Sequence, residues 1–512
     1  MNWDWSSFAQ TSFLAVYTVM LAIVSLYGLH RYIIVYLYYR HRSKAPKAPS
    51  SFDDLPVVTV QLPMFNERFV AARIIEKACL IDYPKDKLQI QVLDDSTDDT
   101  VKIASAAVAE ARARGYDIEY IHRDDRTGFK AGALACGMKS ARGEFITIFD
   151  ADFVPAPDIL RRSVHYFTDP NVCVVQTRWE HLNRDDSILT RSQAILLDGH
   201  FAIEHVARNR SNRFMSFNGT AGTWRRSAIE DAGGWQHDTL TEDLDLSYRA
   251  QLRGWKFVFL PELTAPAELP PEMNAFKAQQ FRWTKGGAQT AIKLLPRVML
   301  SKAPPKVKVE AFFHLTCFTM HLYMMMLVLM MYPAMAIRYQ MGQTTFLQGA
   351  FDLTVFTLAT LSASVFYMAS QFELFGDWRT AFKYLPVLMA IGVGLCVSNS
   401  VAVIEALLGK KSEFVRTPKY GGKAALGHVD GASRARARRK VLPYVEFALG
   451  VYMFVCAMLS IANITQVLAA PFLLIFAFGF FYVSLMSFQA ARARRLADKA
   501  ADRALAARKA GR

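Results

Sequence analysis

The sequence predicts two parts, an α/β domain with a mainly parallel, Rossmann-like sheet and an α-helical transmembrane region. Strand-like and helix-like segments alternate between about residues 50 and 300, which is typical of a parallel sheet covered by helices on both faces. Long apolar runs occupy residues 11–37 and recur from 309 to 488. Hydrophobic residues make up 52% of the chain and charged residues still 21%, so apolar segments are joined to an ordinary water-soluble part. We therefore expect an integral membrane protein with one large extramembrane domain.

The first apolar run indicates a membrane anchor. Thr11 to Leu29 is long enough to cross a bilayer, and no basic stretch precedes it. Arg40, Arg42 and Lys44 follow it, and basic residues favour the cytoplasmic side of a membrane. We expect residues 1–45 to form an N-terminal transmembrane anchor with its N-terminus outside, rather than a cleaved signal.

Residues 46–300 are expected to form the cytoplasmic α/β domain. Its first half predicts, in order, strand Val57–Leu62, helix Glu67–Leu80, strand Leu88–Leu93, a helix ending at Ala113, strand Ile118–His122, helix Gly128–Ser140 and a strand from Phe145 to Asp150. Ligands of such sheets bind beyond the carboxyl ends of the strands. No GxGxxG follows the first strand and no GxxxxGK[ST] is present, which argues against a dinucleotide enzyme and a P-loop ATPase.

Acidic residues follow three of these predicted strands. Glu67 follows the first strand, Asp95 the second, and Asp150 and Asp152 the strand that begins at Phe145. Residues two apart on a strand face the same side, so these last two carboxylates can be presented together. Carboxylate oxygens suit Mg²⁺ or Mn²⁺, which neutralise phosphate-bearing substrates. Acids can also simply end a strand, but three acidic strand ends at one edge of a sheet favour a ligand site.

Two further motifs lie downstream. Thr241-Glu242-Asp243 precedes a helix-spaced apolar run, and the motif suits either a helix N-cap or a catalytic carboxylate. Gln279, Arg282 and Trp283 fall in a basic amphipathic segment before the second apolar region. That segment is either an interfacial helix with an aromatic anchor, or a site in which Trp283 stacks on a sugar and Arg282 contacts a phosphate.

Two other patterns indicate no catalytic or ligand-binding chemistry. His200 and His205 are five apart in an expected helix, a spacing that does not place two side chains on one face for a metal. The basic segments 409–440 and 490–512 adjoin apolar runs, which indicates cytoplasmic segments rather than a nucleic-acid site.

Taken together, these motifs resemble a known family. The aspartate pair at 94–95, the DxD at 150–152, the TED at 241–243 and the QxxRW at 279–283 match the membrane-embedded, processive glycosyltransferases of family 2. Within the cellulose synthase superfamily, the chain is most similar to the cellulose-synthase-like A and C branches, which contain glucomannan mannosyltransferases and β-glucan synthases. The matching stretches are Gln61-Leu-Pro-Met-Phe-Asn-Glu67, Gln91-Val-Leu-Asp-Asp-Ser-Thr97, Phe129-Lys-Ala-Gly-Ala-Leu134, Phe149-Asp-Ala-Asp-Phe153, Phe217-Asn-Gly-Thr-Ala-Gly222 and Glu413-Phe-Val-Arg-Thr-Pro-Lys419. The resemblance covers about residues 50–420, and it departs from the plant A branch in having TED where VED is expected.

The resemblance implies a GT-A fold, an inverting hexosyltransferase and a role for each motif. The nucleotide sugar would be bound by Glu67, Asp95, Lys130, Gln279 and Arg282. Asp150 and Asp152 would position its diphosphate through Mg²⁺ or Mn²⁺, and Asp243 would be the general base. The acceptor sugar would contact Phe217, Asn218, Gly219, Thr220 and Trp283.

Residues 301–490 are expected to form the main transmembrane region, with apolar runs at 309–338, 351–373, 384–408, 442–464 and 467–488. The run 384–408 is the most polar, and placing it at the interface leaves the basic segment 409–440 cytoplasmic, in keeping with the positive-inside rule. Segment 409–440 resembles the family's gating loop, whose counterparts here would be Phe414, Arg416, Thr417 and Lys419, although binding to lipid headgroups is an alternative role. Residues 491–512 are expected to be a basic cytoplasmic tail.

The resemblance implies an enzyme of a bacterial inner membrane that extends a β-1,4-linked polysaccharide from GDP-mannose or UDP-glucose and translocates it. Its partners would be the nucleotide sugar, the polysaccharide acceptor and membrane lipid, with no nucleic acid; accessory export subunits stay open. Two alternatives also stay open. The first is a non-processive transferase that makes a membrane glycolipid, and the second is a transporter or scaffold with a vestigial sugar-binding domain.

Overall fold

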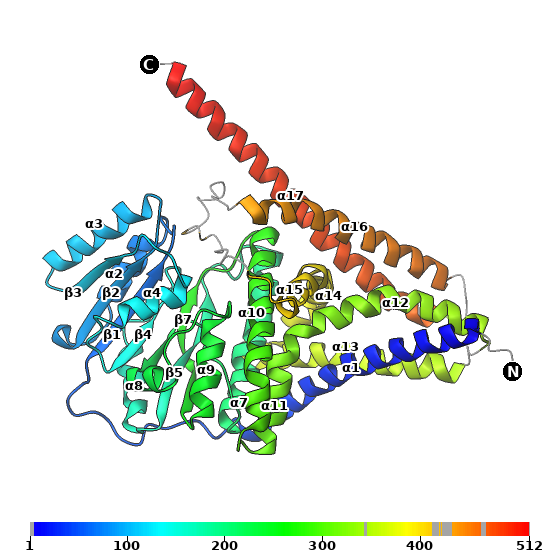
Figure 1. Cartoon of the computed structure of the whole chain (residues 1–512), viewed down its shortest axis with the longest axis horizontal. Coiled ribbons are helices and arrows are strands. Elements are labelled where there is room, and N and C mark those ends of the chain that lie inside the picture. The colour runs from blue at the N-terminus through cyan, green and yellow to red at the C-terminus, as the bar shows by residue number, and fades with distance from the viewer. Residues whose placement is uncertain are drawn as a thin grey trace.

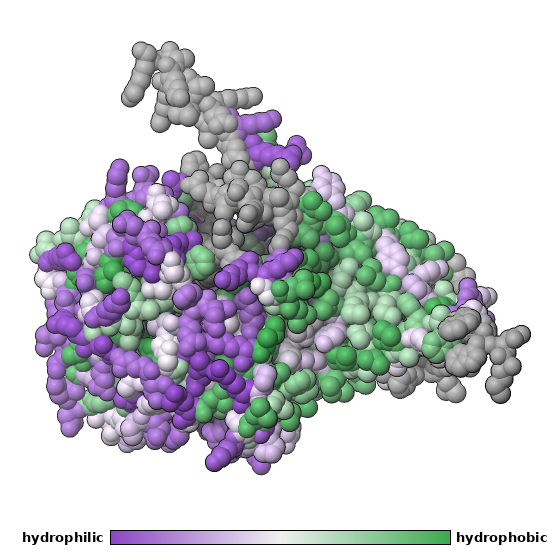
Figure 2. Space-filling model, in the orientation of Figure 1, coloured by the Kyte–Doolittle hydropathy of each residue, from purple (hydrophilic) through white to green (hydrophobic). Residues whose placement is uncertain are grey.

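The computed structural model of the protein describes residues 5–342, 346–411, 419, 421, 433–461 and 467–510. An α/β part lies at one end of the molecule and a bundle of long helices at the other (Figure 1). The α/β surface is mostly hydrophilic in Figure 2, whereas the visible surface of the helical part is mostly hydrophobic. The two parts of the molecule therefore suit two different solvents, water and lipid.

A seven-stranded sheet in the order β3-β2-β1-β4-β6-β5-β7 forms the centre of the α/β part. The strands are β1 (Val58–Met64), β2 (Leu88–Asp94), β3 (Asp117–His122), β4 (Phe145–Ile148), β5 (Val172–His181), β6 (Gly222–Arg225) and β7 (Lys256–Ala267). All neighbours are parallel except β6, which runs antiparallel to β4 and β5. The mainly parallel sheet predicted from the sequence is confirmed.

Helices cover both faces of this sheet. They are α2 (Ala71–Cys79), η1 (Lys85–Lys87), α3 (Thr100–Ala113), α4 (Phe129–Gly137), α5 (Ile159–Ser163), η2 (Val164–Thr168), α6 (Ile188–Asp198), the π-helix η3 (Gly199–His205), α7 (Val206–Arg210), α8 (Arg226–Asp231) and α9 (Glu242–Leu252). One core packs β1 and β2 against α2 and α3. The other packs β4, α4 and η3 against α1 and α13 of the helical part, so this core is continuous between the two parts of the molecule.

Some predicted boundaries shift for local reasons. The helix expected from Glu67 begins at Ala71, because the amide N–H of Val70 bonds to the Glu67 carbonyl in a turn that follows Asn66, whose φ is +55°. The strand expected to reach Asp150 ends at Ile148. The DxD motif therefore lies in a turn beyond β4 and not on the strand itself.

The helical part is formed by α1 (Trp5–His41), α10 (Met273–Leu300), α11 (Pro305–Thr316), η4 (Cys317–Thr319), α12 (Met320–Gln340), α13 (Phe346–Phe375), α14 (Trp378–Gly394), α15 (Cys396–Leu407), α16 (Ser433–Ile461), η6 (Val467–Ala469) and α17 (Ala470–Ala510). Within the described residues, five helical segments are long and apolar enough to cross a membrane: 6–41, 305–340, 378–407, 441–461 and 470–493. These helices are long enough for insertion into a membrane, while the expected bounds of the anchor and of the transmembrane region stay predictions.

The segment 378–407 includes the run expected at the interface. It satisfies the length and hydropathy of a span, but 72% of its most apolar window is buried inside the protein and α14 passes into α15 at Leu395. Its polar residues have partners: Asn399 bonds to His321 of α12, and Glu405 forms an ion pair of 3.0 Å with Lys285 of α10. Their polarity thus serves packing within the protein, and the interfacial position of this segment stays a prediction.

Helix α10 joins the two parts of the molecule (Figure 1). It packs against α9 of the α/β part and against α11, α15 and α17 of the helical part. Two buried lysines on it form ion pairs with the helical part: Lys285 with Glu405 of α15, and Lys277 with Glu446 of α16 at 2.5 Å. Such buried pairs fix geometry, because removing one partner leaves an uncompensated charge.

Candidate active site

A pocket of about 170 Å³ lies beyond the carboxyl ends of β1, β2 and β4 and is also lined by α9 and α10. Parallel pairing aligns Met64 with Asp94 and Gln61 with Ile148, so the three strand ends are neighbours. Twelve of the residues predicted from the sequence line the pocket: Glu67, Asp95, Lys130, Asp150, Asp152, Asn218, Gly219, Asp243, Gln279, Arg282, Trp283 and Lys419. Motifs that are far apart in the sequence therefore meet in one cavity.

Two lysines hold the DxD carboxylates. Lys130 of α4 donates to Asp150 and to the carbonyl of Gly219, the latter at 2.9 Å. Burial alone would lower the pKa of Lys130, but Asp150 and Glu242 raise it, so its ammonium is charged. Lys419 donates to Asp152 Oδ2 at 2.6 Å. Both acids are therefore compensated by cations in the same pocket.

The donor set of the DxD fits a divalent cation shared with a substrate. Among the described residues, no group of three His, Cys, Asp or Glu side chains is arranged to hold a metal alone. Mg²⁺ usually binds through one or two carboxylates together with substrate phosphates, so two carboxylates in an open pocket are the appropriate number. Asp152 is buried and Asp150 half-buried, and both face the pocket with hard oxygen ligands.

Asp243 lies in surroundings that favour its protonated form. It lies in the first turn of α9, and burial together with the neighbouring charge of Glu242 raises its pKa to about 7. The amide of Leu244 donates to its Oδ1 at 2.8 Å, which leaves Oδ2. A Cβ at Gly219, whose φ is +80°, would come within 2.8 Å of that oxygen. Only glycine fits at this position, and its absence of a side chain keeps Oδ2 clear.

Thr241 occupies the N-cap position of α9, and Glu242 and Asp243 lie in the first turn of that helix, as the N-cap interpretation predicts. The Thr241 side chain makes no cap bond to α9, and its hydroxyl bonds to Thr290 of α10 at 3.1 Å. Gly286 of α10 allows this close approach, because a Cβ there would come within 2.6 Å of the Thr241 methyl carbon. Thr241 therefore joins the helix of Asp243 to the helix that carries Gln279, Arg282 and Trp283.

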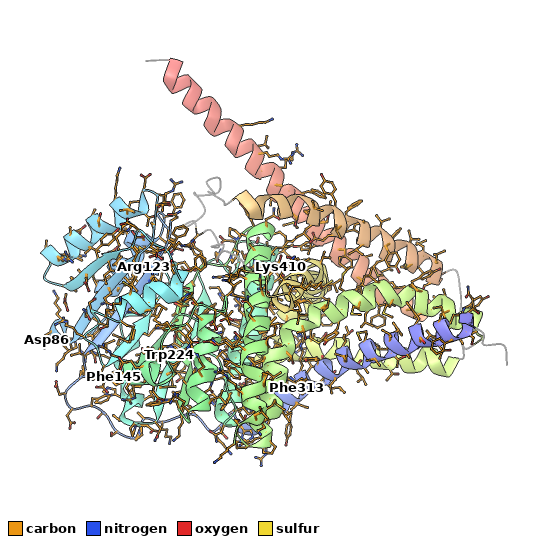
Figure 3. The ribbon with its side chains drawn as sticks, in the orientation of Figure 1. Asp86, Arg123, Phe145, Trp224, Phe313 and Lys410 are labelled. Atoms are coloured by element: carbon orange, nitrogen blue, oxygen red, sulfur yellow. The ribbon has the colours of Figure 1, made fainter. Side chains whose placement is uncertain are left out.

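Beside Asp95 the pocket contains an ion pair that the motifs did not predict. Arg123, in the loop after β3 and labelled in Figure 3, donates to both oxygens of Asp95 at 2.7 and 2.5 Å. Arg126 of the same loop lies 3.4 Å from the centre of the Phe65 ring and lines the pocket. Arg123 thus holds the Asp95 carboxylate in one orientation. The stacked side chains of Arg126 and Phe65 form a flat surface beside it.

The predicted acceptor loop contributes two of its four residues directly. Asn218 and Gly219 line the pocket, whereas Phe217 is buried behind them against Trp224. Thr220 is also buried, and its hydroxyl accepts the amide N–H of Asp150 at 2.8 Å. Phe217 and Thr220 therefore hold the loop and the DxD turn in place and do not face the cavity.

Of the predicted gating-loop residues, Lys419 lies in the pocket, while Phe414, Arg416 and Thr417 lie outside the described residues. The sequence motifs also missed Trp179, His181 and Glu268, which line the same cavity. Trp179 and His181 lie two residues apart on β5, and no strand was predicted from the sequence over these residues. Arg126 could have been anticipated, because the charged stretch 123–126 follows β3 as the acids follow its neighbours.

Comparison with known proteins agrees with this geometry. Residues 56–286 match the family model described as "Glycosyltransferase like family 2". The chain is 43% identical over 306 residues to glucomannan 4-beta-mannosyltransferase 2 of Arabidopsis thaliana, covering 56% of this chain and 57% of that protein. It is 46% identical over 254 residues to probable glucomannan 4-beta-mannosyltransferase 7 of Oryza sativa subsp. japonica, covering 49% of this chain and 43% of that protein. The chain thus spans about half the length of these relatives.

Among solved structures, the mannosyltransferase PcManGT from Pyrobaculum calidifontis, in complex with GDP-Man and Mn²⁺, matches with a TM-score of 0.50 at 21% identity. The match covers 77% of this chain and 100% of that one, and it shows the shared fold. The α/β part therefore has a GT-A-like fold. Residues 56–286 match glycosyltransferase family 2, and the chain is similar over about half its length to plant glucomannan 4-beta-mannosyltransferases.

Proposed function

We propose that the chain is a membrane-embedded, inverting glycosyltransferase that moves a hexose from a nucleotide sugar onto a growing β-1,4-linked polysaccharide and translocates the product. The observation that carries this proposal is the pocket itself. A buried carboxylate of raised pKa, Asp243, shares one cavity with the two DxD carboxylates and with Arg282 and Trp283. A base, a diphosphate site and an aromatic sugar platform are the parts that an inverting sugar transfer needs.

Asp243 removes the proton in the proposed reaction. An acceptor hydroxyl gives its proton to Asp243 while its oxygen bonds to the anomeric carbon of the donor sugar. The bond from that carbon to the diphosphate oxygen breaks on the opposite side, which inverts the configuration. A pKa of about 7 suits this step, because a base whose pKa lies near the working pH is both available and strong enough.

The departing diphosphate gains negative charge that must be offset. Lys130 and Lys419 already lie on the DxD carboxylates, and Arg282 interacts with Asp150 and Asp243 across the pocket. These three cations would stabilise the leaving group where its charge develops. When bound, Mg²⁺ or Mn²⁺ held by Asp152 and Asp150 would supply further positive charge to the diphosphate.

GDP-mannose is the donor that the comparisons favour over UDP-glucose. The plant relatives named above are mannosyltransferases, and the structure of similar fold was solved with GDP-Man and Mn²⁺. The corresponding product is a β-1,4-linked mannan or glucomannan. UDP-glucose stays as the second donor to be measured.

The proposed arrangement keeps residues 46–300 in the cytoplasm between an anchor at 1–45 and a transmembrane region at 301–490, with the basic tail 491–512 on the same cytoplasmic side. The five candidate spans support membrane insertion. The relatives named above are plant proteins, so they give no support to the bacterial inner membrane expected from the sequence. The proposal is therefore restricted to a membrane enzyme with a cytoplasmic active site.

The deciding experiment incubates membranes containing the protein with radiolabelled GDP-mannose or UDP-glucose and Mg²⁺ or Mn²⁺. We expect a polymer from GDP-mannose that a β-1,4-mannanase digests. Asp243→Asn should abolish it, while Asp86→Asn, at an exposed position far from the pocket and labelled in Figure 3, should not. Polymer from the Asp243→Asn variant at the normal rate would refute the mechanism, and a single added sugar on lipid would support the non-processive alternative.

A further inference from the structure

The π-helix η3 places two histidines beside the acceptor loop. An α-helix would turn residues five apart to different faces, but the wider i→i+5 turn brings them back to nearly the same face. The rings of His200 and His205 lie 4.3 Å apart, so the separation expected from an ordinary helix is wrong here. Single π-turns within helices often occur at functional sites.

Both imidazoles bond to one side chain of the pocket, Asn218. His205 Nε2 lies 2.5 Å from Asn218 Oδ1, and Asn218 Nδ2 lies 3.0 Å from His200 Nε2. His200 Nδ1 lies 2.9 Å from Glu204 Oε2. Because a carboxylate only accepts, one assignment satisfies every contact: Nδ1 of His200 donates to Glu204, Asn218 Nδ2 donates to His200, and His205 Nε2 donates to Asn218 Oδ1.

The surroundings of His205 support this assignment. Burial, with the neighbouring His200, holds the pKa of His205 well below its ordinary value, so the ring is neutral with a single N–H. Its Nδ1 is buried and has no hydrogen-bond partner within the described part of the chain. An unpaired buried acceptor is tolerated better than an unpaired N–H, so the proton belongs on Nε2.

Charged side chains next to the two histidines form a further series of contacts. Burial would raise the pKa of Glu204, but Arg208 and the hydrogen bond with His200 hold it below its ordinary value, so it is a carboxylate. Arg208 bonds to Glu310 of α11 at 3.0 Å, and Glu310 lies 3.0 Å from His30 of α1. Phe313, labelled in Figure 3, stacks on His30 at 4.1 Å. The series of contacts therefore runs from the pocket to the first membrane helix.

The backbone of the acceptor loop is held separately. Gln176 of β5 accepts the amide N–H of Asn218 at 3.1 Å and donates to the carbonyls of Thr220 and Ala221. A change at His200 or His205 can thus turn the Asn218 amide without moving the loop. With Oδ1 used by His205 and one N–H used by His200, the second N–H of Asn218 is the amide group that remains for a ligand.

We propose that His200 and His205 are positioning residues that fix the Asn218 amide so that it presents an N–H, and not its oxygen, to a hydroxyl oxygen of the acceptor sugar. The proposal rests on the proposed function, since it assigns Asn218 a role in acceptor binding beside Asp243. It predicts that the two histidines affect the acceptor and leave the donor unaffected.

The test uses the purified full-length chain in detergent, with the donor that the wild type uses and manno- or cello-oligosaccharides as acceptors. His205→Gln keeps an N–H near the position of Nε2, whereas His205→Leu removes it. We expect His205→Leu to raise the acceptor KM about tenfold, as for one lost hydrogen bond, while donor affinity and donor hydrolysis stay unchanged. His205→Gln should keep an acceptor KM near that of the wild type, and Asn218→Asp should raise it as His205→Leu does.

Equal losses in the glutamine and leucine variants, or an acceptor KM unaffected by Asn218→Asp, would overturn the proposal. A parallel fall in donor hydrolysis would also overturn it, since it would indicate a merely structural role. Nitrogen-15 histidine spectra decide the same point without activity: protonation of His205 at Nε2 and of His200 at Nδ1 is expected, and the opposite tautomers would refute it. Failure of the wild type with both donors would instead reject the proposed function.

Discussion

At the residue scale, Asp243 predicts the pH dependence of the reaction. Its pKa of about 7 means that it is protonated, and unable to accept a proton, below that pH. The transfer rate should therefore fall as pH drops through about 7, and level off above it. Glu242 is one cause of the raised pKa, so Glu242→Gln should shift this acid limb to lower pH. Pre-steady-state transfer rates from pH 5 to 9 measure both effects, and an unshifted limb would contradict this assignment.

Replacement of the base gives a second prediction. Asp243→Asn should lower the transfer rate by about 10²–10⁴-fold, the usual contribution of a general base. Binding of the nucleotide diphosphate, measured by calorimetry, should stay within a factor of a few, because Lys130, Arg282 and Lys419 remain. An equal loss of binding would mean that Asp243 holds the donor instead.

Lys419 allows a matched comparison of two lysines. Its ammonium lies 2.6 Å from Asp152, whereas Lys410, labelled in Figure 3, is exposed at the start of the same basic segment. Lys419→Ala should weaken diphosphate binding about tenfold or more, in line with the loss of a charge-assisted hydrogen bond. Lys410→Ala should leave it unchanged. Equal effects would indicate that the segment acts only through its overall charge.

At the element scale, the ion pair between Lys285 of α10 and Glu405 of α15 is testable by a double substitution. Lys285 is fully buried, so Lys285→Met alone leaves a buried carboxylate and should cost about 3–5 kcal/mol of stability. Lys285→Met with Glu405→Leu should recover most of that loss, because neither charge is then left unpaired. Thermal unfolding in detergent measures both, and equal destabilisation by the single and double variants would contradict the argument.

The strands of the sheet were more predictable than the helices around the site. Alternating segments and acidic strand ends sufficed to predict β1, β2 and β4 and the meeting of Glu67, Asp95 and Asp150. The π-turn of η3 escaped prediction because sequence periodicity assumes 3.6 residues per turn. The hydrogen bond between the Thr241 and Thr290 hydroxyls escaped prediction because it is a tertiary contact that no local rule reveals.

At the scale of the whole molecule, the fit of the DxD to a shared cation predicts dependence on a divalent metal. Chelation with EDTA should abolish transfer and weaken nucleotide diphosphate binding, and Mn²⁺ or Mg²⁺ should restore both. In Asp152→Asn the metal concentration needed for half-maximal binding should rise, because one hard ligand is lost. Transfer at the normal rate after chelation would exclude this role.

For the molecule as a whole, the prediction of a sugar substrate depended on the resemblance to a known family. Residue chemistry alone indicated a phosphate site beside a membrane, but it did not single out a sugar. The family motifs indicated a sugar as the substrate, and the match of residues 56–286 to glycosyltransferase family 2 agrees with this prediction. Neither residue chemistry nor the family motifs predict the ion pair of Arg123. Its guanidinium pairs with Asp95, and the two residues lie on loops that meet only after folding.

Helix α10 constrains how a long product can be made. It is a single helix from Met273 to Leu300 that lines the pocket with Trp283 and is anchored to α15 and α16 through Lys285 and Lys277. The α/β part is thus joined to the bundle through a continuous helix and two buried ion pairs. A movement of the α/β part away from the bundle would have to break these buried pairs, which is costly. In a processive reaction the polymer would therefore advance past Trp283 by one sugar unit at a time, while Trp283 keeps its place in the enzyme.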